Sequence, residues 1–517
     1  MLAILRNKIK QSLKYQCLFS FIAGLSLAFA YAPFGYWPIT IIVPAVWLTI
    51  INKKTIKSAT LIGYCFGLGW FAAGISWVHV SIAQFGGMPF IITLLLMTLL
   101  CGYLAIFPAL ACYLSSKFSA KNTFSVWLFP TFWLISEYLR SVVLSGFPWL
   151  SLGYSQIDSP LAAFAPVIGE IGITFIMLIL AVSLSQLLLK NQIAKHLFVI
   201  STLIVINLLI TMPNWTHLQN KQIKVALIQG NIKQELRWQP DQAWPAMSKY
   251  LDLTRKNYDA DLIVWPESAV PQLEPLSQDY LSMVNSAAAF NNSAIITGIQ
   301  NYDLTTKEYF NGLIVLGKKD VRSEQGQYFY QTHNRYYKHH LLPIGEFVPF
   351  GDLLRPLAPF FNLPNSSFSR GKYNQANITA NGLHILPLIC FEIVFSRQLQ
   401  ANFHHDTDII LTVSNDAWFG DSNGPHQHLE ITRMRALEFG RPTLRSTNNG
   451  VTAAIDHHGK VIAQIPQFKE AVLKTTIDLV SGKTPYSLWG EWLSYLLAAI
   501  LFIVVKFTSR NTHKSND

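Results

Sequence analysis

Leu386-Pro387-Leu388-Ile389-Cys390-Phe391-Glu392-Ile393-Val394-Phe395 is a branched apolar run that contains one thiol and one carboxylate. A short run of this composition between polar stretches predicts a buried strand, with Cys390 at its end. A buried strand does not carry a carboxylate such as Glu392 unless a partner compensates the charge. Because most buried cysteines are simply small hydrophobes, the rest of the chain must decide whether Cys390 has a chemical role.

The other cysteines lie in long apolar segments, at Cys17, Cys65, Cys101 and Cys112. Cys390 is therefore the only thiol in the polar part of the chain. That part has no second cysteine with which to form an intramolecular disulfide.

The composition of the 517 residues is that of a membrane protein. Hydrophobic residues make up 51% of the chain and charged residues only 13%, about half the usual charged share. The net charge of +11 is spread along the chain without a basic helix or an aromatic-basic motif, which argues against nucleic acid as a partner.

Eight apolar segments are predicted to cross a membrane, at about 16–32, 37–51, 60–80, 89–114, 123–139, 161–188, 197–212 and 488–506. Lysines follow the second, fourth, sixth and eighth segments, whereas the loops after the first and third lack Lys and Arg. This alternation predicts that both chain ends lie inside the cell and that residues 213–487 lie outside the cytoplasm. We therefore expect a membrane domain at 1–215, an external domain at 216–487, and an eighth helix with a cytoplasmic tail at 488–517.

Two groups of residues in the membrane segments, a set of glycines and a set of charged side chains, are unusual in a lipid-facing helix. Gly63, Gly67 and Gly69 share one segment and predict a helix-packing face. The charged residues Glu137, Arg140 and Glu170 are costly in a bilayer, so we expect them to pair with one another or to meet a lipid headgroup.

From Lys224 onward, short β-type runs alternate with helical patterns, which predicts one α/β domain with layered sheets. The runs are Val225–Gln229, Leu262–Trp265, Ala294–Gly298, Leu313–Leu316, Ile385–Ile389, Ile409–Val413 and Val451–Ile455. The helical stretches are Ala243–Tyr258, Ser277–Phe290 and Leu429–Phe439.

Three groups suited to acid–base and nucleophilic chemistry follow predicted strands or apolar patches: Glu267, Lys338 and Cys390. A cysteine attacks as the thiolate, so it needs a base to take its proton. A carboxylate can take that proton, and an ammonium group can stabilise the oxyanion that forms.

These three motifs resemble the nitrilase superfamily, whose triad is Glu, Lys and Cys in this chain order. Further matching stretches are Leu411–Gly420, Pro425–His428, Arg441–Pro442 and Asn448–Gly450. Together with the predicted spans and the motifs Ala32–Gly35, Ile75–Val78 and Ser145–Leu150, they resemble one branch of it, the apolipoprotein N-acyltransferase family. Phe391 departs from the pattern, because tyrosine is common after the family's nucleophile.

The resemblance implies a membrane α-helical domain of eight spans and an α/β, nitrilase-like αββα sandwich. It implies a bacterial inner-membrane enzyme with its catalytic domain on the periplasmic side. Cys390 would take an acyl chain from a phospholipid, typically phosphatidylethanolamine, and pass it to the α-amino group of a diacylglyceryl-cysteine on an apolipoprotein. Glu267 would be the base, while Lys338 and the Phe391 backbone N–H would hold the oxyanion. No cofactor is implied.

Supporting and substrate-binding residues are also predicted. Glu346 would orient Lys338, and Glu392 would hold the strand end or a loop; either could also be an ordinary ion-pair residue. Trp238 matches a family tryptophan near the acyl chain, although a core tryptophan is also compatible with the sequence.

The apolar stretch 347–364 between the Lys338 and Cys390 motifs has no clear helical or strand period. We expect it to dip into the outer leaflet and admit acyl chains, with a core-packing insertion as the alternative. Its predicted lipid-binding residues are Phe360, Phe361 and Leu363.

His426 and His428 could suggest a metal, but no Cys or Glu completes a zinc-like spacing, so we expect none. The nearest alternative function is a membrane-tethered amidase acting on small C–N substrates, which would share the triad. A transporter or receptor with a ligand-binding outer domain would not need it.

Overall fold

The computed structural model describes residues 12–343, 345–347 and 368–514, with side chains described up to residue 508. The chain divides into two compact units. The first holds residues up to Ala83, Met88–Asn214 and the chain from Trp489 onward; the second holds Gln84–Gly87 and Trp215–Leu488.

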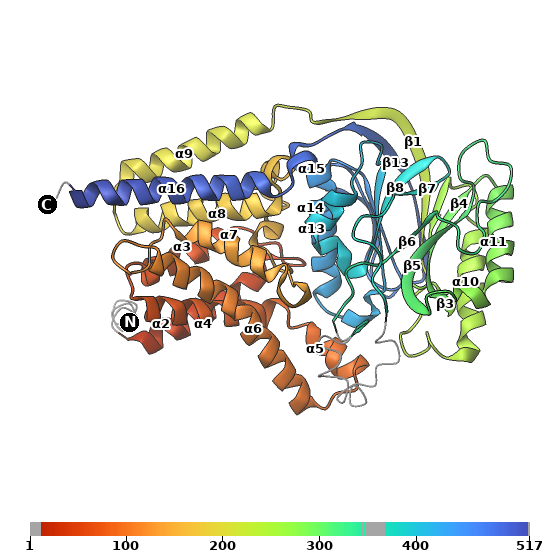
Figure 1. Cartoon of the computed structure of the whole chain (residues 1–517), viewed down its shortest axis with the longest axis horizontal. Coiled ribbons are helices and arrows are strands. Elements are labelled where there is room, and N and C mark those ends of the chain that lie inside the picture. The colour runs from red at the N-terminus through yellow and green to blue at the C-terminus, as the bar shows by residue number, and fades with distance from the viewer. Residues whose placement is uncertain (1–11, 344, 348–367, 515–517) are drawn as a thin grey trace. The chain divides into compact units, whose positions relative to one another are not determined.

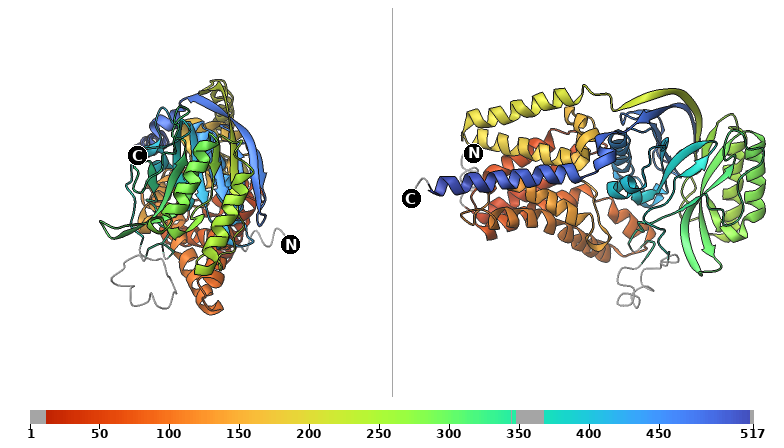
Figure 2. Two further views of the ribbon diagram at one scale, coloured as in Figure 1. Left: turned by 90° about the vertical axis from the view of Figure 1, so that its right-hand side faces the viewer. Right: turned by 45° about the horizontal axis from the view of Figure 1, so that its top comes forward.

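The first unit is helical. Its helices are α2 Leu13–Ser26, α3 Ile39–Ile51, α4 Ile56–Gly74, α5 Val78–Val80, α6 Phe90–Lys117, α7 Phe129–Arg140, α8 Ala165–Leu188, α9 Ile193–Ile210 and α16 Trp492–Lys514. The last helix, α16, runs along α7 and α8 although it comes far later in the chain (Figure 1 and Figure 2). Two hydrogen bonds fix this pairing: Thr131 Oγ1 donates to the Ala498 carbonyl at 3.0 Å, and Ser494 Oγ donates to the Ile168 carbonyl at 2.8 Å.

Among the described residues, four helices are long and apolar enough to cross a membrane: Leu13–Ala30, Phe90–Lys117, Pro160–Leu188 and Ile193–Ile210. The pair Ile56–Gly74 and Val78–Phe85, bent by 63°, would make five if it forms one span. Ile39–Ile51 and Trp492–Thr508 are apolar but shorter. The fifth predicted segment, 123–139, holds only the 12-residue α7. The count of eight spans therefore stays a prediction.

The glycines of α4 lie where helices approach closely, as predicted. A Cβ at Gly69 would lie 2.0 Å from the Phe21 carbonyl oxygen of α2, and one at Gly63 would lie 2.5 Å from Cys112 Sγ of α6. A side chain at either position would push the helices apart, so the packing-face prediction is confirmed.

The charged residues of this unit are buried and have partners. The Arg140 guanidinium donates to the Glu137 carboxylate and to the backbone carbonyls of Phe147 and Trp149. Glu170 instead accepts from Ser151 Oγ at 2.5 Å. The expected pairing thus holds for Glu137 with Arg140, and Glu170 has a separate hydroxyl partner.

The second unit is built on two sheets. The seven-stranded sheet has the order β13–β1–β2–β4–β5–β6, with β3 paired to β4, and the six-stranded sheet has the order β12–β11–β10–β9–β8–β7. The first contains β1 Thr216–Gln229, β2 Leu262–Val264, β3 Val270–Leu273, β4 Ala294–Asp303, β5 Glu308–Gly317, β6 Arg335–Tyr337 and β13 Ala471–Gly482. The second contains β7 Ile378–Ala380, β8 Leu383–Ile389, β9 Ile409–Ser414, β10 Thr443–Thr447, β11 Thr452–Ile455 and β12 Val461–Ile465.

Alternation along the strands creates the layers. In β1, Val225 and Leu227 pack into the core between the two sheets, whereas Ala226 and Ile228 pack against the helical layer. Figures 1 and 2 show α10 Ala243–Arg255 and α11 Gln278–Phe290 covering the outer face of the first sheet. The helices α13 Ser396–Asn402 and α14 Gly424–Phe439 cover the second sheet, so the unit is the predicted αββα sandwich.

Each of the seven predicted strand runs corresponds to a strand of this sandwich, although Trp265 and Val451 lie just outside β2 and β11. In the run 386–395, however, only the first part is strand, because β8 ends at Ile389 and Cys390–Val394 forms the 3-10 helix η9. The parallel neighbours β8, β9 and β10 end at one edge of their sheet, which brings the residues after these strands together.

Candidate active site

Cys390 lies at a sharp turn from β8 into η9. Its φ is +53°, in the left-handed region that residues with a Cβ rarely adopt. Such a conformation persists only where the surroundings hold it in place, and it is common at functional sites. The turn explains why the sequence pattern overextended the strand: the apolar run continues, but the backbone direction changes at Cys390.

Glu267 follows β2, beyond Pro266, and 9% of its surface is exposed. Its Oε1 accepts from Asn311 Nδ2 at 2.8 Å, and its Oε2 accepts from the Asn415 backbone N–H at 3.0 Å. The buried Arg237 guanidinium donates to the backbone carbonyls of Glu267 and Ser268. The carboxylate is therefore fixed by donors from β5 and from the residue after β9, one from each sheet.

Lys338 comes directly after β6 and is 2% exposed. Its Nζ lies 2.8 Å from Glu346 Oε2 and 3.7 Å from Glu267 Oε1. Burial disfavours the ammonium form, but the charges of Glu346 and then Glu267 outweigh this effect and raise the pKa of Lys338 above its ordinary value. Lys338 is thus a permanent buried cation beside two carboxylates.

Asn311, in β5, links these groups and was not singled out from the sequence. Its Nδ2 donates to Glu267 Oε1 at 2.8 Å and to Glu346 Oε1 at 2.9 Å. Its backbone carbonyl accepts from the Lys338 N–H at 2.8 Å. One residue thereby sets the spacing of base, cation and counter-ion. The available signal in the sequence was an amide side chain two residues before the apolar run Leu313–Leu316, close to a predicted buried strand.

The thiol of Cys390 is protonated at neutral pH in this arrangement. Burial, and then the negative charge of Glu267, raise the pKa of Cys390 to about 12, and the positive charge of Lys338 opposes them. A neutral thiol must lose its proton before it can attack. The carboxylate that acts on it most strongly is Glu267, a base fixed in position.

Glu392 lies in η9 and is fully buried, and both of its carboxylate oxygens accept hydrogen bonds. Its Oε1 accepts from the backbone N–H groups of His339 and His340 and from Gln398 Nε2; its Oε2 accepts from Ile389 N–H and Tyr336 Oη. These hydrogen bonds connect the end of β8 to the segment after Lys338. The ring of Phe391 packs edge-to-face on Phe395, with centroids 5.1 Å apart.

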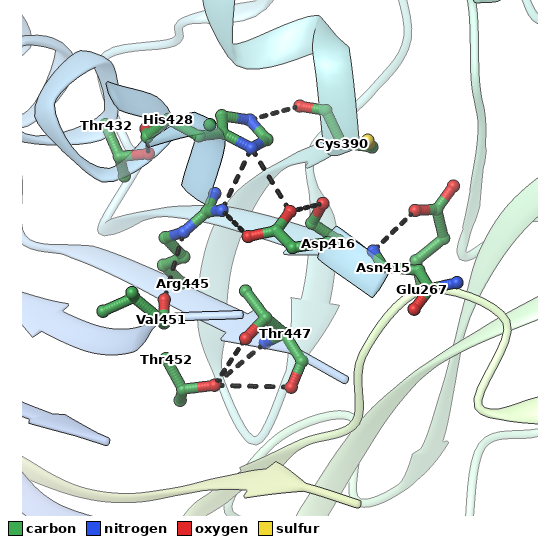
Figure 3. A network of polar contacts seen from close by, with 12 residues as sticks. Glu267, Cys390, Asn415, Asp416, His428, Thr432, Arg445, Thr447, Val451 and Thr452 are labelled. Atoms are coloured by element: carbon green, nitrogen blue, oxygen red, sulfur yellow. Dashed lines mark hydrogen bonds and ion pairs between the residues drawn. The ribbon is translucent and has the colours of Figure 1, made fainter. Parts of the chain in front are cut away.

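A buried polar cluster lies behind Cys390 (Figure 3). His428 Nε2 lies 3.1 Å from the Cys390 carbonyl oxygen, and His428 Nδ1 lies 3.0 Å from Arg445 Nη2. Arg445 Nη2 also donates to Asp416 Oδ2 at 2.6 Å. The sequence suggested His426 and His428 only as weak metal candidates. Within the described part of the chain, no group of three or more His, Cys, Asp or Glu side chains could hold a metal ion.

The predicted substrate-binding residues are placed only in part. Trp238 is 38% exposed, with the Arg237 guanidinium 5.7 Å from its ring centroid, so it is not a core tryptophan. Phe360, Phe361 and Leu363 lie outside the described residues, and their lipid contact stays a prediction.

Comparison with known families matches both parts of the chain. Residues 23–183 match the apolipoprotein N-acyltransferase N-terminal domain, and residues 224–484 match the carbon-nitrogen hydrolase family. Curated relatives named apolipoprotein N-acyltransferase cover nearly the whole chain. The protein of Vibrio parahaemolyticus is 49% identical over 94% of this chain and 96% of its own. That of Vibrio cholerae is 49% identical over 92% and 93%, and that of Haemophilus influenzae is 38% identical over 96% and 97%.

Proposed function

Because the chain belongs to the apolipoprotein N-acyltransferase family, we propose that it acylates apolipoproteins through a thioester on Cys390. The relatives' shared name and the N-terminal domain match identify a membrane acyltransferase of lipoprotein maturation. The observation that carries the residue assignment is the fixed Glu267 carboxylate beside Lys338, with both charges acting on the Cys390 thiol.

In the first step, Glu267 takes the thiol proton and Cys390 Sγ attacks an ester carbonyl carbon of a phospholipid. The developing oxyanion is stabilised by Lys338 Nζ and by the Phe391 backbone N–H. The carbon–oxygen bond then breaks, the leaving alcohol of the lysophospholipid takes the proton from Glu267, and the acyl group stays on sulfur.

In the second step, the α-amino group of a diacylglyceryl-cysteine attacks the thioester carbonyl carbon. Glu267 accepts a proton from the amine, the carbon–sulfur bond breaks, and the proton passes to Cys390 Sγ. The amide product and the free thiol result. Phosphatidylethanolamine as donor is part of the proposal, as is Trp238 as a contact for the acyl chain.

The proposal includes the arrangement in the cell. Residues 1–215 would form the membrane domain with seven spans, and residues 488–517 would form the eighth span and a cytoplasmic tail. Residues 216–487 would lie on the periplasmic side of the inner membrane. The loop charges support this orientation.

Mass spectrometry of intact purified protein tests the thioester. After incubation with dipalmitoyl phosphatidylethanolamine, the wild type should gain one palmitoyl mass on Cys390, and a diacylglyceryl-cysteine peptide should remove it. Cys390→Ser should gain none, since a hydroxyl is a far weaker nucleophile near neutral pH. An adduct in that variant, or one on another residue of the wild type, would reject the assignment.

The alternative, a membrane-tethered amidase, is less supported. It would share Glu267, Lys338 and Cys390, but it gives no account of the match of residues 23–183 to the acyltransferase N-terminal domain. Such an enzyme would release acid from small amides and would form no adduct with the phospholipid.

A further inference from the structure

Asp416, His428 and Arg445 form a cluster that the proposed chemistry does not yet use. They come from three elements: the 3-10 helix η10 Asp416–Phe419, α14 and β10. Asp416 is 2% exposed, and His428 and Arg445 are fully buried. Burying an ion pair and an imidazole together is costly unless each polar atom has a partner.

The partners of His428 determine its protonation. The Cys390 carbonyl oxygen can only accept, so Nε2, at 3.1 Å, must carry the hydrogen. Nδ1 lies 3.0 Å from Arg445 Nη2, which can only donate, and 3.4 Å from Asp416 Oδ1, which already accepts from Ser414 Oγ. At the shorter of the two contacts, Nδ1 is the acceptor. Burial and the charge of Arg445 also lower the pKa of His428. His428 is therefore a neutral imidazole in a single tautomer.

Arg445 and Asp416 hold this imidazole in place. Arg445 Nη2 donates to Asp416 Oδ2 at 2.6 Å, and Arg445 Nε donates to the Val451 carbonyl at 3.2 Å. Ser414 Oγ donates to Asp416 Oδ1 at 2.6 Å. The pair is anchored to two strands of the second sheet, so its position is fixed before any substrate binds.

The carbonyl that His428 contacts belongs to the peptide between Cys390 and Phe391. A trans peptide is planar, so its C=O and N–H point in opposite directions and rotate together. This peptide follows Cys390, whose left-handed backbone conformation needs support from its surroundings. A hydrogen bond to the carbonyl therefore also sets the direction of the Phe391 N–H.

We propose that His428 is a positioning residue that aims the Phe391 N–H at the oxyanion by holding the Cys390 carbonyl, with Arg445 and Asp416 fixing its tautomer. The inference rests on the proposed function, in which that N–H stabilises the tetrahedral intermediate. It assigns to His428 a role in acyl transfer and none in generating the thiolate.

The test compares two reactions of the same thiol. Alkylation of Cys390 by iodoacetamide forms no oxyanion, whereas acylation by phosphatidylethanolamine does. His428→Ala should slow acyl-enzyme formation on the order of 10- to 100-fold, somewhat less than loss of a complete oxyanion donor. Its alkylation rate should stay within about threefold of wild type, because the thiol itself is unchanged. His428→Gln, whose amide N–H can reach the same carbonyl, should recover most of the acylation rate.

Three results would overturn the proposal: unchanged acylation in His428→Ala, an equal fall of acylation and alkylation in that variant, or a glutamine variant as slow as the alanine variant. The alkylation rate also reports a misfolded site, since a displaced Cys390 would change it. Failure of the proposed function would show separately, as a palmitoyl adduct of the wild type on a residue other than Cys390.

Discussion

Glu346 Oε2 lies 2.8 Å from Lys338 Nζ, closer than the 3.7 Å that separates this nitrogen from Glu267 Oε1. Lys338 is thus neutralised mainly by Glu346. Glu267 can then exchange a proton without breaking the closest ion pair of the site.

Replacing Glu346 by Gln should therefore impair the base. Without Glu346, the buried ammonium would pair with Glu267 and stabilise its ionised form, which lowers its basicity. Acyl-enzyme formation, followed by mass spectrometry with phosphatidylethanolamine, should slow on the order of 10- to 100-fold. Glu470→Gln, which removes a half-exposed carboxylate paired with Lys249, is the matched control and should leave the rate unchanged. Equal rates in both variants would contradict the role given to Glu346.

The charges around Cys390 predict opposite shifts of its ionisation in two variants. Burial and Glu267 raise the pKa of the thiol to about 12, while Lys338 lowers it. Glu267→Gln removes a negative charge and should lower that pKa, so alkylation by iodoacetamide at pH 8 should become faster. Lys338→Met removes the positive charge, so alkylation should become slower.

Both variants should nevertheless lose acyl transfer, by about a hundredfold or more, because one lacks the base and the other an oxyanion donor. The measurement is the alkylation rate of the Cys390 peptide between pH 7 and 10. Shifts of the same sign in the two variants would show that these charges do not act on the thiol.

Arg445→Met should destabilise the second unit through Asp416. Removing one partner of a buried ion pair costs about 3–5 kcal/mol. For a unit of this size, that corresponds to a fall in Tm on the order of 10 °C. Arg255→Met, at an exposed pair with Asp252, is the matched control and should change Tm little.

The fall in Tm caused by Arg445→Met should also depend on pH. In the wild type, the positive charge of Arg445 opposes the effect of burial, and the pKa of Asp416 lies below its usual range. The stabilisation from Asp416 is then present above its unfolded pKa of about 3.9 and constant between pH 5 and 8. In Arg445→Met, burial raises that pKa, so protonation at pH 5 relieves the penalty. The Tm difference from wild type should shrink from pH 8 to pH 5; a constant difference would indicate that the ionisation of Asp416 is not responsible.

The sequence was sufficient for the parts of the site that follow strongly apolar strands. Glu267 and Cys390 come after branched runs, which predict buried strands with polar residues at their ends. Arg445 could not be found in this way, because a charge in the middle of Thr443–Thr447 contradicts the pattern of a buried strand. The structure compensates this charge with the carboxylate of Asp416. The left-handed turn at Cys390 does not follow from the sequence for a related reason, because the residues on both sides of the turn are equally apolar. Only the tertiary contacts of the Cys390 carbonyl and of Glu392 reveal the turn.

The predicted orientation can be tested in intact cells with two variants that each carry one introduced cysteine, with labelling measured on the peptide that contains it. Thr306 lies in the exposed turn between β4 and β5, and Lys121 lies in the exposed loop between α6 and α7. The loop charges place the first outside the cytoplasm and the second inside. Thr306→Cys should react with a membrane-impermeant maleimide in cells whose outer membrane alone is permeabilised, whereas Lys121→Cys should react only after lysis. Both substitutions lie far from Cys390 in sequence and should leave acyl transfer intact, so activity serves as the folding control. Labelling of Lys121→Cys before lysis, with Thr306→Cys labelled only after it, would reverse the topology and separate the site from substrates exported across the membrane.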